Sequence, residues 1–273
     1  MRQVKIQGFT DNANSDFRPA ICVHGIENTG TTRFGTTAPG LIGWIAIDRN
    51  SKTIVEEQKE KNKLDILVNK DPYISHKDAI RIALIENPDE TKKIYSEAVK
   101  RIFDDCMKLA DHPDVESIVL DRASQIFDYI LFSHFGRRNQ IETFQRGAPN
   151  QDMIDLISAL GSKNLVLACK SAEVWADTGE VDKSGKKKQA PTGRMKPDGF
   201  GKIGQFVTAT IELTAKRGKL TGEDEEEKLA QKYKCKIVHC KNNVLLEGQD
   251  LSEWGVCGEA ITWSNVLSVI GVE

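Results

Sequence analysis

The sequence lacks long apolar runs and an excess of either charge. No run of about 18 apolar residues occurs, so no segment suits a membrane-spanning helix. The first residues, MRQVKIQGFTDN, lack the apolar core of a secretory signal peptide. Basic and acidic residues nearly balance, 38 against 40, for a formal net charge of −2. We therefore expect a cytoplasmic protein without membrane contact, in which any nucleic-acid binding depends on a local cluster of positive charge.

The cysteines lack the spacing of a metal site. The chain has 6 cysteines, scattered along its length, and none forms a C-x-x-C pair. Cys235 and Cys240 lie near each other but have no second ligand pair, and several of the others lie in apolar, strand-like runs. This distribution favours reduced structural thiols over the two alternatives, disulfides or a zinc site.

What the sequence does contain is a glycine-framed loop directly after an apolar strand at 20–24. The loop, GIENTGTT, begins at Gly25 and ends at Thr32. It fits the phosphate-binding pattern G-x-x-x-x-G-K-[ST] at every fixed position but one, because Thr31 stands where the pattern has lysine. In that pattern backbone N–H groups surround a phosphate, the lysine reaches the β- and γ-phosphates, and the last hydroxyl binds Mg²⁺.

We therefore predict a phosphate cradle that binds ATP with Mg²⁺ but hydrolyses ATP slowly or not at all. The residues expected to contact the nucleotide are Gly25, Ile26, Glu27, Asn28, Thr29, Gly30, Thr31, Thr32 and Arg33.

Two later strands end in aspartate. The apolar run 117–120 leads into Asp121, which is placed like the aspartate that holds Mg²⁺ opposite the loop threonine in P-loop NTPases. We predict Thr32 and Asp121 as the metal residues; the alternative is that Asp121 only caps its strand. Asp48 ends the strand at 42–47 and should face the same edge of the sheet, where it could orient water or the metal in catalysis.

A third residue expected at this edge is Lys170, which follows the strand 164–169. A lysine there could act on the γ-phosphate in place of the missing loop lysine. An ordinary surface lysine after a strand is an equally good interpretation. His24, just before Gly25, is better explained as a strand histidine than as a ligand.

Apolar runs alternate with helical segments along the whole chain, a pattern typical of an α/β fold with a mostly parallel sheet flanked by helices. We expect one domain over 1–273, with a helical insertion at about 56–112 that contains a strong helix at about 89–109. A second helix is predicted at about 150–160 and a final one at 261–272. The remaining predicted strands are 206–213, 236–240 and 243–247.

The segment at about 178–204 breaks this alternation, because it has few large apolar residues and many glycines. It cannot bury enough surface to offset its ordering entropy, so we predict a mobile loop. Between 183 and 202 it carries seven basic residues and one acidic residue, a local charge of about +6. We predict that it binds single-stranded DNA, and the alternative is a merely solvated basic loop. The residues expected to contact DNA are Lys186, Lys187, Lys188, Arg194, Lys196, Lys202 and, by stacking on a base, Phe200.

In this order the motifs resemble the RecA-like P-loop ATPases of phages, in particular AAA-family nucleotide-binding proteins of the single-strand annealing and recombinase type. The matching segments are 25–34, 38–40, the strands ending at Asp48 and Asp121, 150–153, 164–170, 192–193, 198–204 and 241–242. The resemblance implies a RecA-like core, ATP at the P-loop, single-stranded DNA at the loops after Asp121 and Lys170, and a role in DNA recombination or annealing. It also implies a homo-oligomer in which Lys241 of one copy acts on the phosphates bound by its neighbour, in the host cytoplasm if a phage encodes the chain.

Two positions depart from that family. Thr31 replaces the P-loop lysine, and Asn50 lies about where a RecA-type catalytic glutamate would be sought. Loss of a charge aimed at the γ-phosphate removes several kcal/mol of transition-state stabilisation. Two other interpretations stay open. One is a catalytically silent P-loop scaffold that binds nucleic acid or a protein without ATP turnover. The other is a phosphotransfer enzyme of another P-loop branch, for which no acceptor motif is visible.

Overall fold

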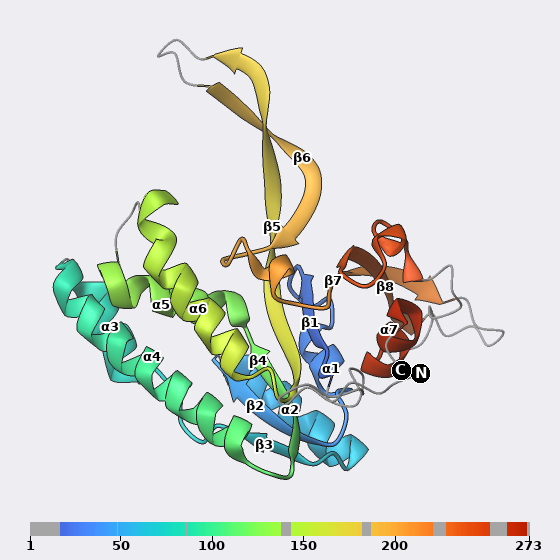
Figure 1. The fold of residues 1–273 in the computed structure, drawn as a ribbon, viewed down its shortest axis with the longest axis horizontal. Helices are drawn as coiled ribbons and strands as arrows, with labels where there is room; N and C mark the ends of the chain where they lie inside the picture. Colours follow the sequence, from blue (N-terminus) through green and yellow to red (C-terminus); the bar gives the residue numbers. More distant parts are fainter. Residues whose placement is uncertain are drawn as a thin grey trace, which may run out of the picture.

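A twisted eight-stranded sheet runs through the molecule, with helices on both of its faces (Figure 1). The computed structural model describes residues 17–47, 49–85, 87–137, 143–181, 187–220, 228–251 and 261–271. Its strands are β1 Ala20–Gly25, β2 Leu41–Ala46, β3 Ile66–Val68, β4 Val115–Asp121, β5 Asn164–Val181, β6 Lys187–Pro197, β7 Ala209–Leu220 and β8 Lys228–Cys240. Its α-helices are α1 Thr31–Gly35, α2 Arg49–Asn62, α3 His76–Leu84, α4 Pro88–Asp111, α5 Ala123–Phe135, α6 Gly147–Ala159 and α7 Trp263–Ile270. Short 3₁₀ helices are η1 Thr143–Arg146, η2 Ile203–Gln205 and η3 Val244–Leu246.

The strand order is β3-β2-β4-β5-β1-β7-β8, and β6 pairs with the outer part of β5. The strands from β3 to β7 in this order pair in parallel, whereas β8 is antiparallel to β7 and β6 is antiparallel to β5. The predicted α/β class with a mostly parallel, helix-flanked sheet is therefore confirmed. Parallel strands covered on both faces read as continuous apolar runs, and for this reason the sequence revealed most of them.

Two apolar cores lie on opposite faces of the sheet. On one face α1, α2 and α7 pack against the strands through residues such as Phe34, Val55 and Trp263. On the other face α4, α5 and α6 pack through residues such as Ile102 and Phe127. All five described cysteines are buried free thiols, which confirms the structural interpretation for those positions; Cys257 lies outside the described residues.

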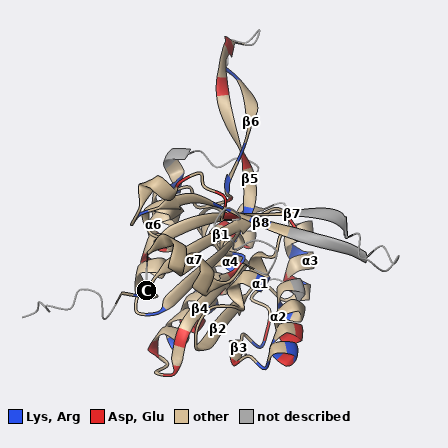
Figure 2. Ribbon diagram, turned by 90° about the vertical axis from the view of Figure 1, so that its right-hand side faces the viewer, with Lys and Arg blue, Asp and Glu red and all other residues tan. Residues whose placement is uncertain are grey.

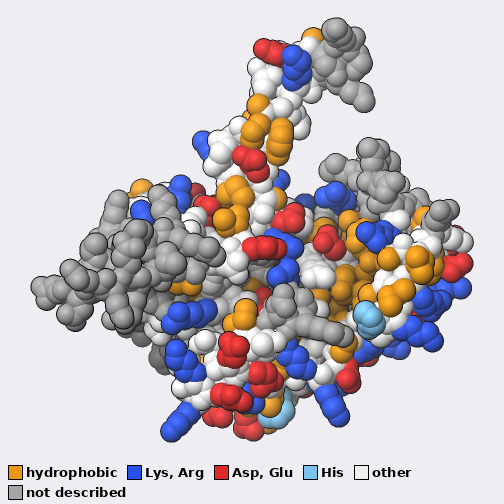
Figure 3. All heavy atoms as spheres, turned by 180° about the vertical axis from the view of Figure 1, so that it is seen from behind, with side chains coloured by type: hydrophobic (Ala, Val, Ile, Leu, Met, Phe, Trp, Pro, Cys, Tyr) orange, Lys and Arg blue, Asp and Glu red, His pale blue; other side chains and the backbone are white. Residues whose placement is uncertain are grey.

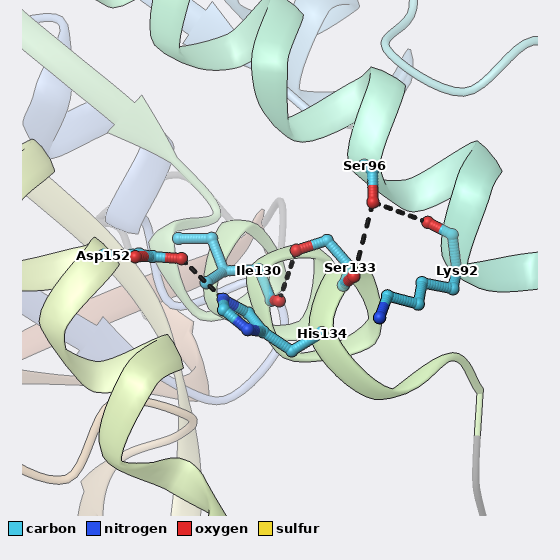
Figure 4. A network of polar contacts seen from close by, with 6 residues as sticks. All are labelled: Lys92, Ser96, Ile130, Ser133, His134 and Asp152. Atoms are coloured by element: carbon cyan, nitrogen blue, oxygen red, sulfur yellow. Dashed lines mark hydrogen bonds and ion pairs between the residues drawn. The ribbon is translucent and has the colours of Figure 1, made fainter. Parts of the chain in front are cut away.

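Polar contacts fix the order of the three helices on this second face (Figure 4). The Ser96 hydroxyl of α4 donates to the Ser133 carbonyl oxygen of α5 at 3.3 Å. At the same end of α5, Nε2 of His134 lies 2.7 Å from Oδ2 of Asp152 on α6. These contacts hold α5 in place, and α5 begins two residues after Asp121.

The segment predicted as a helical insertion contains more than helices. Its main helix begins where expected, since Pro88 opens α4 and Oδ1 of Asn87 accepts a hydrogen bond from the Asp89 backbone N–H at 2.9 Å. The short strand β3 lies between α2 and α3, however, and extends the sheet beyond β2. The expected final helix is confirmed as α7, whereas the strand predicted at 243–247 is wrong, because a 3₁₀ turn occupies it.

The segment predicted as an irregular basic loop is largely a β-hairpin. Strand β5 continues beyond the sheet to Val181, and β6 returns beside it from Lys187 to Pro197. We call these paired segments, residues 170–181 and Lys187–Pro197, the β5–β6 hairpin; it projects from the body (Figures 1 and 3). A scarcity of apolar residues excludes burial in a core, but the backbone groups of two strands can pair with each other without a core. Lys183 and Lys186 lie outside the described residues.

Candidate functional site

A cavity of about 380 Å³ lies at the edge of the sheet where β1 and β4 reach their carboxyl ends and β5 leaves the sheet, here called the carboxyl rim. In open α/β sheets this rim is where ligands bind. The turn after β1, the first residues of α1, Asp121 at the end of β4 and Lys170 on β5 all contribute to the lining. The cavity thus brings together three groups of residues that the sequence predicted separately.

The turn after β1 has the geometry that its two glycines predicted. A Cβ atom on Gly25 would lie 2.0 Å from Oγ1 of Thr29 and 2.7 Å from the Leu213 carbonyl oxygen, so no side chain fits there. Gly30 has a φ of +91°, in the left-handed region that favours glycine. Thr29 is buried, and its hydroxyl donates to the Ile26 carbonyl oxygen at 2.8 Å, which closes the turn.

The two predicted metal residues lie side by side. The Thr32 hydroxyl donates to Oδ2 of Asp121 at 3.1 Å, although the residues are 89 positions apart in the sequence. Asp121 is only 2% exposed, and its Oδ1 accepts a hydrogen bond from the Arg122 backbone N–H at 3.1 Å. The predicted proximity is therefore confirmed, while the role of the pair toward Mg²⁺ stays a prediction.

The oxygen donors of this pair suit Mg²⁺ bound to a nucleotide. Mg²⁺ at such sites takes one or two protein oxygens and completes its shell with phosphate oxygens and water. No group of three or more His, Cys, Asp or Glu side chains that could hold a metal occurs in the described part of the chain. A hydroxyl with one carboxylate thus fits a metal that arrives with phosphates better than one held by the protein alone.

Thr31, which replaces the pattern lysine, lines the cavity at the first position of α1. Lys170 lies beside the phosphate cradle, because it pairs with Gly25 across the β1–β5 ladder. Among the described lining residues Lys170 is the only lysine, and Arg33 and Arg122 supply the other cationic side chains. Lys170 is therefore the side chain best placed to substitute for the missing loop lysine.

Helix α1, which follows the turn, is short. It has 5 residues and ends at Gly35, after which a turn leads to β2. The dipole effect of a helix comes from aligned peptide units, so one turn contributes little of it. Backbone amides of the turn and the nearby cations would have to provide most of the attraction for an anion.

Tyr233 is a lining residue that the sequence analysis missed. It comes from β8, pairs with Ala215, and its ring carbon Cε1 would lie 3.3 Å from a Cβ atom on Gly30. Its neighbours in the sequence are mostly charged or polar, so no local signal separates it from an ordinary surface tyrosine. Helix α2 also lines the cavity, through Ser51, Ile54 and Gln58.

The described structure does not place Asp48, Lys241 or Phe200 at this cavity. Asp48 lies outside the described residues. Lys241 follows antiparallel β8 and therefore lies at the opposite edge, the amino rim, where its backbone N–H donates to the Thr208 carbonyl oxygen at 2.9 Å. It is far from the cradle of its own chain, and its action on a neighbour's nucleotide stays a prediction. Phe200 is 2% exposed and packs against Phe127 and Phe206, so the predicted stacking of this ring on a base is wrong.

The remaining predicted DNA residues are on or near the hairpin. Lys187, Lys188, Arg194 and Lys196 are exposed on β6, Lys202 is exposed just before η2, and Lys186 lies outside the described residues. Acidic residues of β5 face part of this charge, since Nζ of Lys187 lies 2.8 Å from Oδ2 of Asp177. Figure 2 shows both signs of charge along the hairpin. The excess positive charge there is thus smaller than the sequence of one strand suggested.

His24 is a buried strand residue directly before the cradle. Its Nδ1 lies 2.8 Å from Oγ of Ser171, and its Nε2 is buried with no hydrogen-bond partner in the described structure. Burial lowers the pKa of His24 to about 4, so the ring is neutral at pH 7. A neutral ring under the turn adds no charge to the cavity, in agreement with the structural interpretation of His24.

Within the described residues no helix is both long and apolar enough to cross a membrane. The sequence matches no protein-family model, and no curated protein matches it either. The function of the chain must therefore be inferred from its residues and their arrangement.

Proposed function

We propose that this chain is a RecA-like P-loop protein that binds ATP and Mg²⁺ at the carboxyl rim and single-stranded DNA along the β5–β6 hairpin. It would act in DNA recombination or annealing, with slow or no ATP hydrolysis. Oligomerisation, which the resemblance implies, belongs to the same proposal.

The observation that carries this proposal is the hydrogen bond between Thr32 and Asp121, next to the glycine-framed turn. A hydroxyl from α1 and a carboxylate from the end of β4 meet beside the glycine-framed turn, which is the usual arrangement for Mg²⁺ in P-loop NTPases. When bound, Mg²⁺ would neutralise phosphate charge, and Thr32 and Asp121 are the residues that would hold it.

The strand order supports a nucleotide at this position. From β1 the chain crosses to β2, on one side of β1, while β7 lies on the other side and pairs directly with β1. Ligands of open α/β sheets bind where connections depart in opposite directions, outside the carboxyl ends of the strands. The Gly25–Lys170 pairing brings a cation to the same point.

Binding without efficient hydrolysis follows from the cations that are present. Catalysis of phosphoryl transfer depends on charges aimed at the γ-phosphate. Thr31 supplies a hydroxyl where a lysine would supply such a charge, and Lys170 approaches from a different strand. The glycine-framed turn and the oxygen atoms of Thr32 and Asp121 remain. The affinity for ATP should therefore fall less than the rate of ATP hydrolysis.

The hairpin supports a role with single-stranded DNA. It carries exposed cations and projects away from the sheet (Figure 2). Trp175 on β5 is 56% exposed, and an exposed aromatic ring is a stacking surface for a base. Trp175 therefore takes the stacking role that the sequence analysis gave to Phe200.

Calorimetric titration with ATP, with and without Mg²⁺, tests the nucleotide part of the proposal. We expect weak Mg²⁺-dependent binding, and Thr31→Lys should raise affinity or turnover. Asp121→Asn should remove the Mg²⁺ dependence with little change in melting temperature. Asp114→Asn is the matched control, because Asp114 is an exposed aspartate beside the opposite end of β4 and should leave binding unchanged.

Two results would overturn this part of the proposal. Absence of ATP binding at millimolar concentration, for both the natural chain and Thr31→Lys, would favour the silent scaffold. A large fall in melting temperature for Asp121→Asn with unchanged ATP affinity would make Asp121 a structural cap.

A further inference from the structure

A second, larger cavity adjoins the phosphate cradle. It has a volume of about 870 Å³, within the range of small-molecule sites. Its walls are α3 and α5, with Tyr95 of α4 between them. Glu27, Arg122 and Lys170 line both cavities, so the two are contiguous at the carboxyl rim.

One wall of this second cavity is aromatic. The ring centroid of Tyr95 lies 5.3 Å from that of Tyr129 and 5.0 Å from that of Phe132. All three side chains line the cavity, and Tyr129 and Phe132 are only partly buried. A partly exposed aromatic cluster inside a cavity offers a surface on which a planar ring can stack.

The polar lining is mixed in charge. Arg122 and Lys170 lie at the end shared with the phosphate cradle, and Arg137 adds a third cation. Asp128 lies on the same helix as Tyr129, one residue before it, and Asp198 lines the cavity too. Cations next to the cradle suit a phosphate, whereas a carboxylate beside an aromatic wall suits hydrogen bonding to an amino group.

Asp128 occupies an unusual environment for a carboxyl group. Burial and the neighbouring charge of Asp198 raise the pKa of Asp128 to about 6, against the opposing effects of Lys170 and Arg146. At pH 7.5 the group is mostly ionised and can accept hydrogen bonds. An incompletely solvated carboxylate gains from a ligand that donates to it.

We propose that this second cavity binds a nucleoside monophosphate unit whose base carries an exocyclic amino group, stacked on Tyr129 and hydrogen-bonded to Asp128, with its phosphate near Arg122 and Lys170. The unit is either a free nucleotide or one residue of a single DNA strand. The site itself does not need ATP in the first cavity; only its place in DNA recombination or annealing rests on the proposed function.

Titration of the full chain with dCMP and dTMP at pH 7.5, without ATP or Mg²⁺, tests this assignment. We expect dCMP to bind more tightly than dTMP, because thymine has no exocyclic amino group to donate to Asp128. Tyr129→Leu should weaken dCMP binding about 5- to 150-fold, the equivalent of one lost stacking contact. Tyr129→Phe keeps the ring and should keep most of the affinity.

Asp128→Asn separates the specific role from a structural one. It should reduce the preference for dCMP over dTMP while the stacking contribution of Tyr129 persists. Asp114→Asn is the matched control, because Asp114 is exposed and lines neither cavity, and it should leave dCMP affinity unchanged. Circular dichroism spectra and melting curves identify any variant that fails to fold. If Tyr129→Leu fails to fold, the dCMP affinity of Tyr129→Phe is the measurement that tests the site.

The same titrations with dC and dT oligonucleotides distinguish the two sources of the unit. Binding by oligonucleotides alone, sensitive to Tyr129→Leu and Asp128→Asn, assigns the cavity to a single strand, and binding by dCMP alone assigns it to a free nucleotide. The proposal is overturned if neither probe binds, or if binding is the same in folded Tyr129→Leu and Asp128→Asn proteins. Failure of ATP binding with intact dCMP binding would reject the proposed function and leave this inference standing.

Discussion

The two halves of strand β5 share an extended backbone conformation but differ in burial and in pairing partners. Residues 164–169 are all buried between two layers of helices, whereas no residue of 170–181 is buried. The inner half pairs with β1 and β4, and from Ser171 outward the strand pairs with β6. An apolar core stabilises the first half; cross-strand hydrogen bonds and ion pairs hold the second.

This difference matches the tasks we assign to the two halves. Lys170 stands at their junction, where a rigid sheet positions it beside the cradle. Beyond it the strand leaves the body, and an isolated pair of strands has little stability of its own. A surface of this kind is available for a partner such as a DNA strand, while the inner half keeps the site geometry constant.

The sharpest test of the comparison is an alanine in each half. Leu167→Ala removes a side chain with 0% exposure and should lower the free energy of unfolding by about 2–5 kcal/mol. Trp175→Ala removes a larger side chain that is 56% exposed and should cost less than about 0.5 kcal/mol. Urea denaturation measures both. A loss above about 1 kcal/mol for Trp175→Ala would mean that the outer half packs against something, such as a second copy of the chain.

The free energy of unfolding should depend on pH through Asp128 of α5, which lines the second cavity together with Lys170 at the junction. Because the pKa of Asp128 is raised to about 6 in the folded protein, its stabilising contribution is full below about pH 4 and is lost as pH rises through 6. Asp128→Asn should therefore increase stability at pH 8 by about 1–2 kcal/mol, allowing for partial exposure, and change it little at pH 4. Asp114→Asn is the control. Equal effects of Asp128→Asn at both pH values would contradict the prediction.

The affinity for single-stranded DNA should depend on the hairpin that contains the outer half of β5, and not on the inner half. Replacing Lys187, Lys188, Arg194 and Lys196 together by alanine should weaken binding to single-stranded DNA of any sequence. Each lost phosphate contact should reduce the slope of log affinity against log salt by about 0.7. Fluorescence anisotropy at several salt concentrations measures this slope. An unchanged slope would remove the hairpin from the DNA site, and Lys163→Ala on the body serves as the control.

The smallest expected effect concerns the ion pairs across the hairpin. Nζ of Lys187 lies 2.8 Å from Asp177, and both side chains are exposed to solvent. A double-mutant cycle with Lys187→Ala and Asp177→Ala should give a small coupling energy that falls at high salt. A larger, salt-independent coupling would show that the hairpin is more enclosed than this structure has it.

Sequence reasoning succeeded where a property depends on nearby residues or on parallel topology. Gly25 and Gly30 were recognisable because the turn leaves no room for a Cβ atom at one and needs a positive φ at the other. Thr32 and Asp121 were paired correctly because the carboxyl ends of parallel strands meet at one rim. The buried strands were visible as apolar runs for the same reason.

Sequence reasoning failed where the position of a residue depends on segments that are far apart in the sequence or on antiparallel strand pairing. Antiparallel pairing puts Lys241 at the amino rim and Tyr233 over Gly30. Phe200 looked like an exposed loop residue, but the chain after β6 folds back and buries its ring against Phe127. Such outcomes depend on which surfaces meet, and local residue types do not specify that.

The sequence by itself therefore determined the α/β class, the glycine frame of the turn after β1 and the proximity of Thr32 to Asp121, since sterics and strand alternation are local constraints. Only the tertiary structure decided that residues 170–197 include a projecting hairpin and that Asp128, Tyr129 and Lys170 line one cavity. The hairpin arises from the pairing of β5 with β6, and the cavity from the packing that brings α3, α5 and Lys170 to one place. The free energy of that packing depends on contacts between distant segments and is not encoded in any one of them.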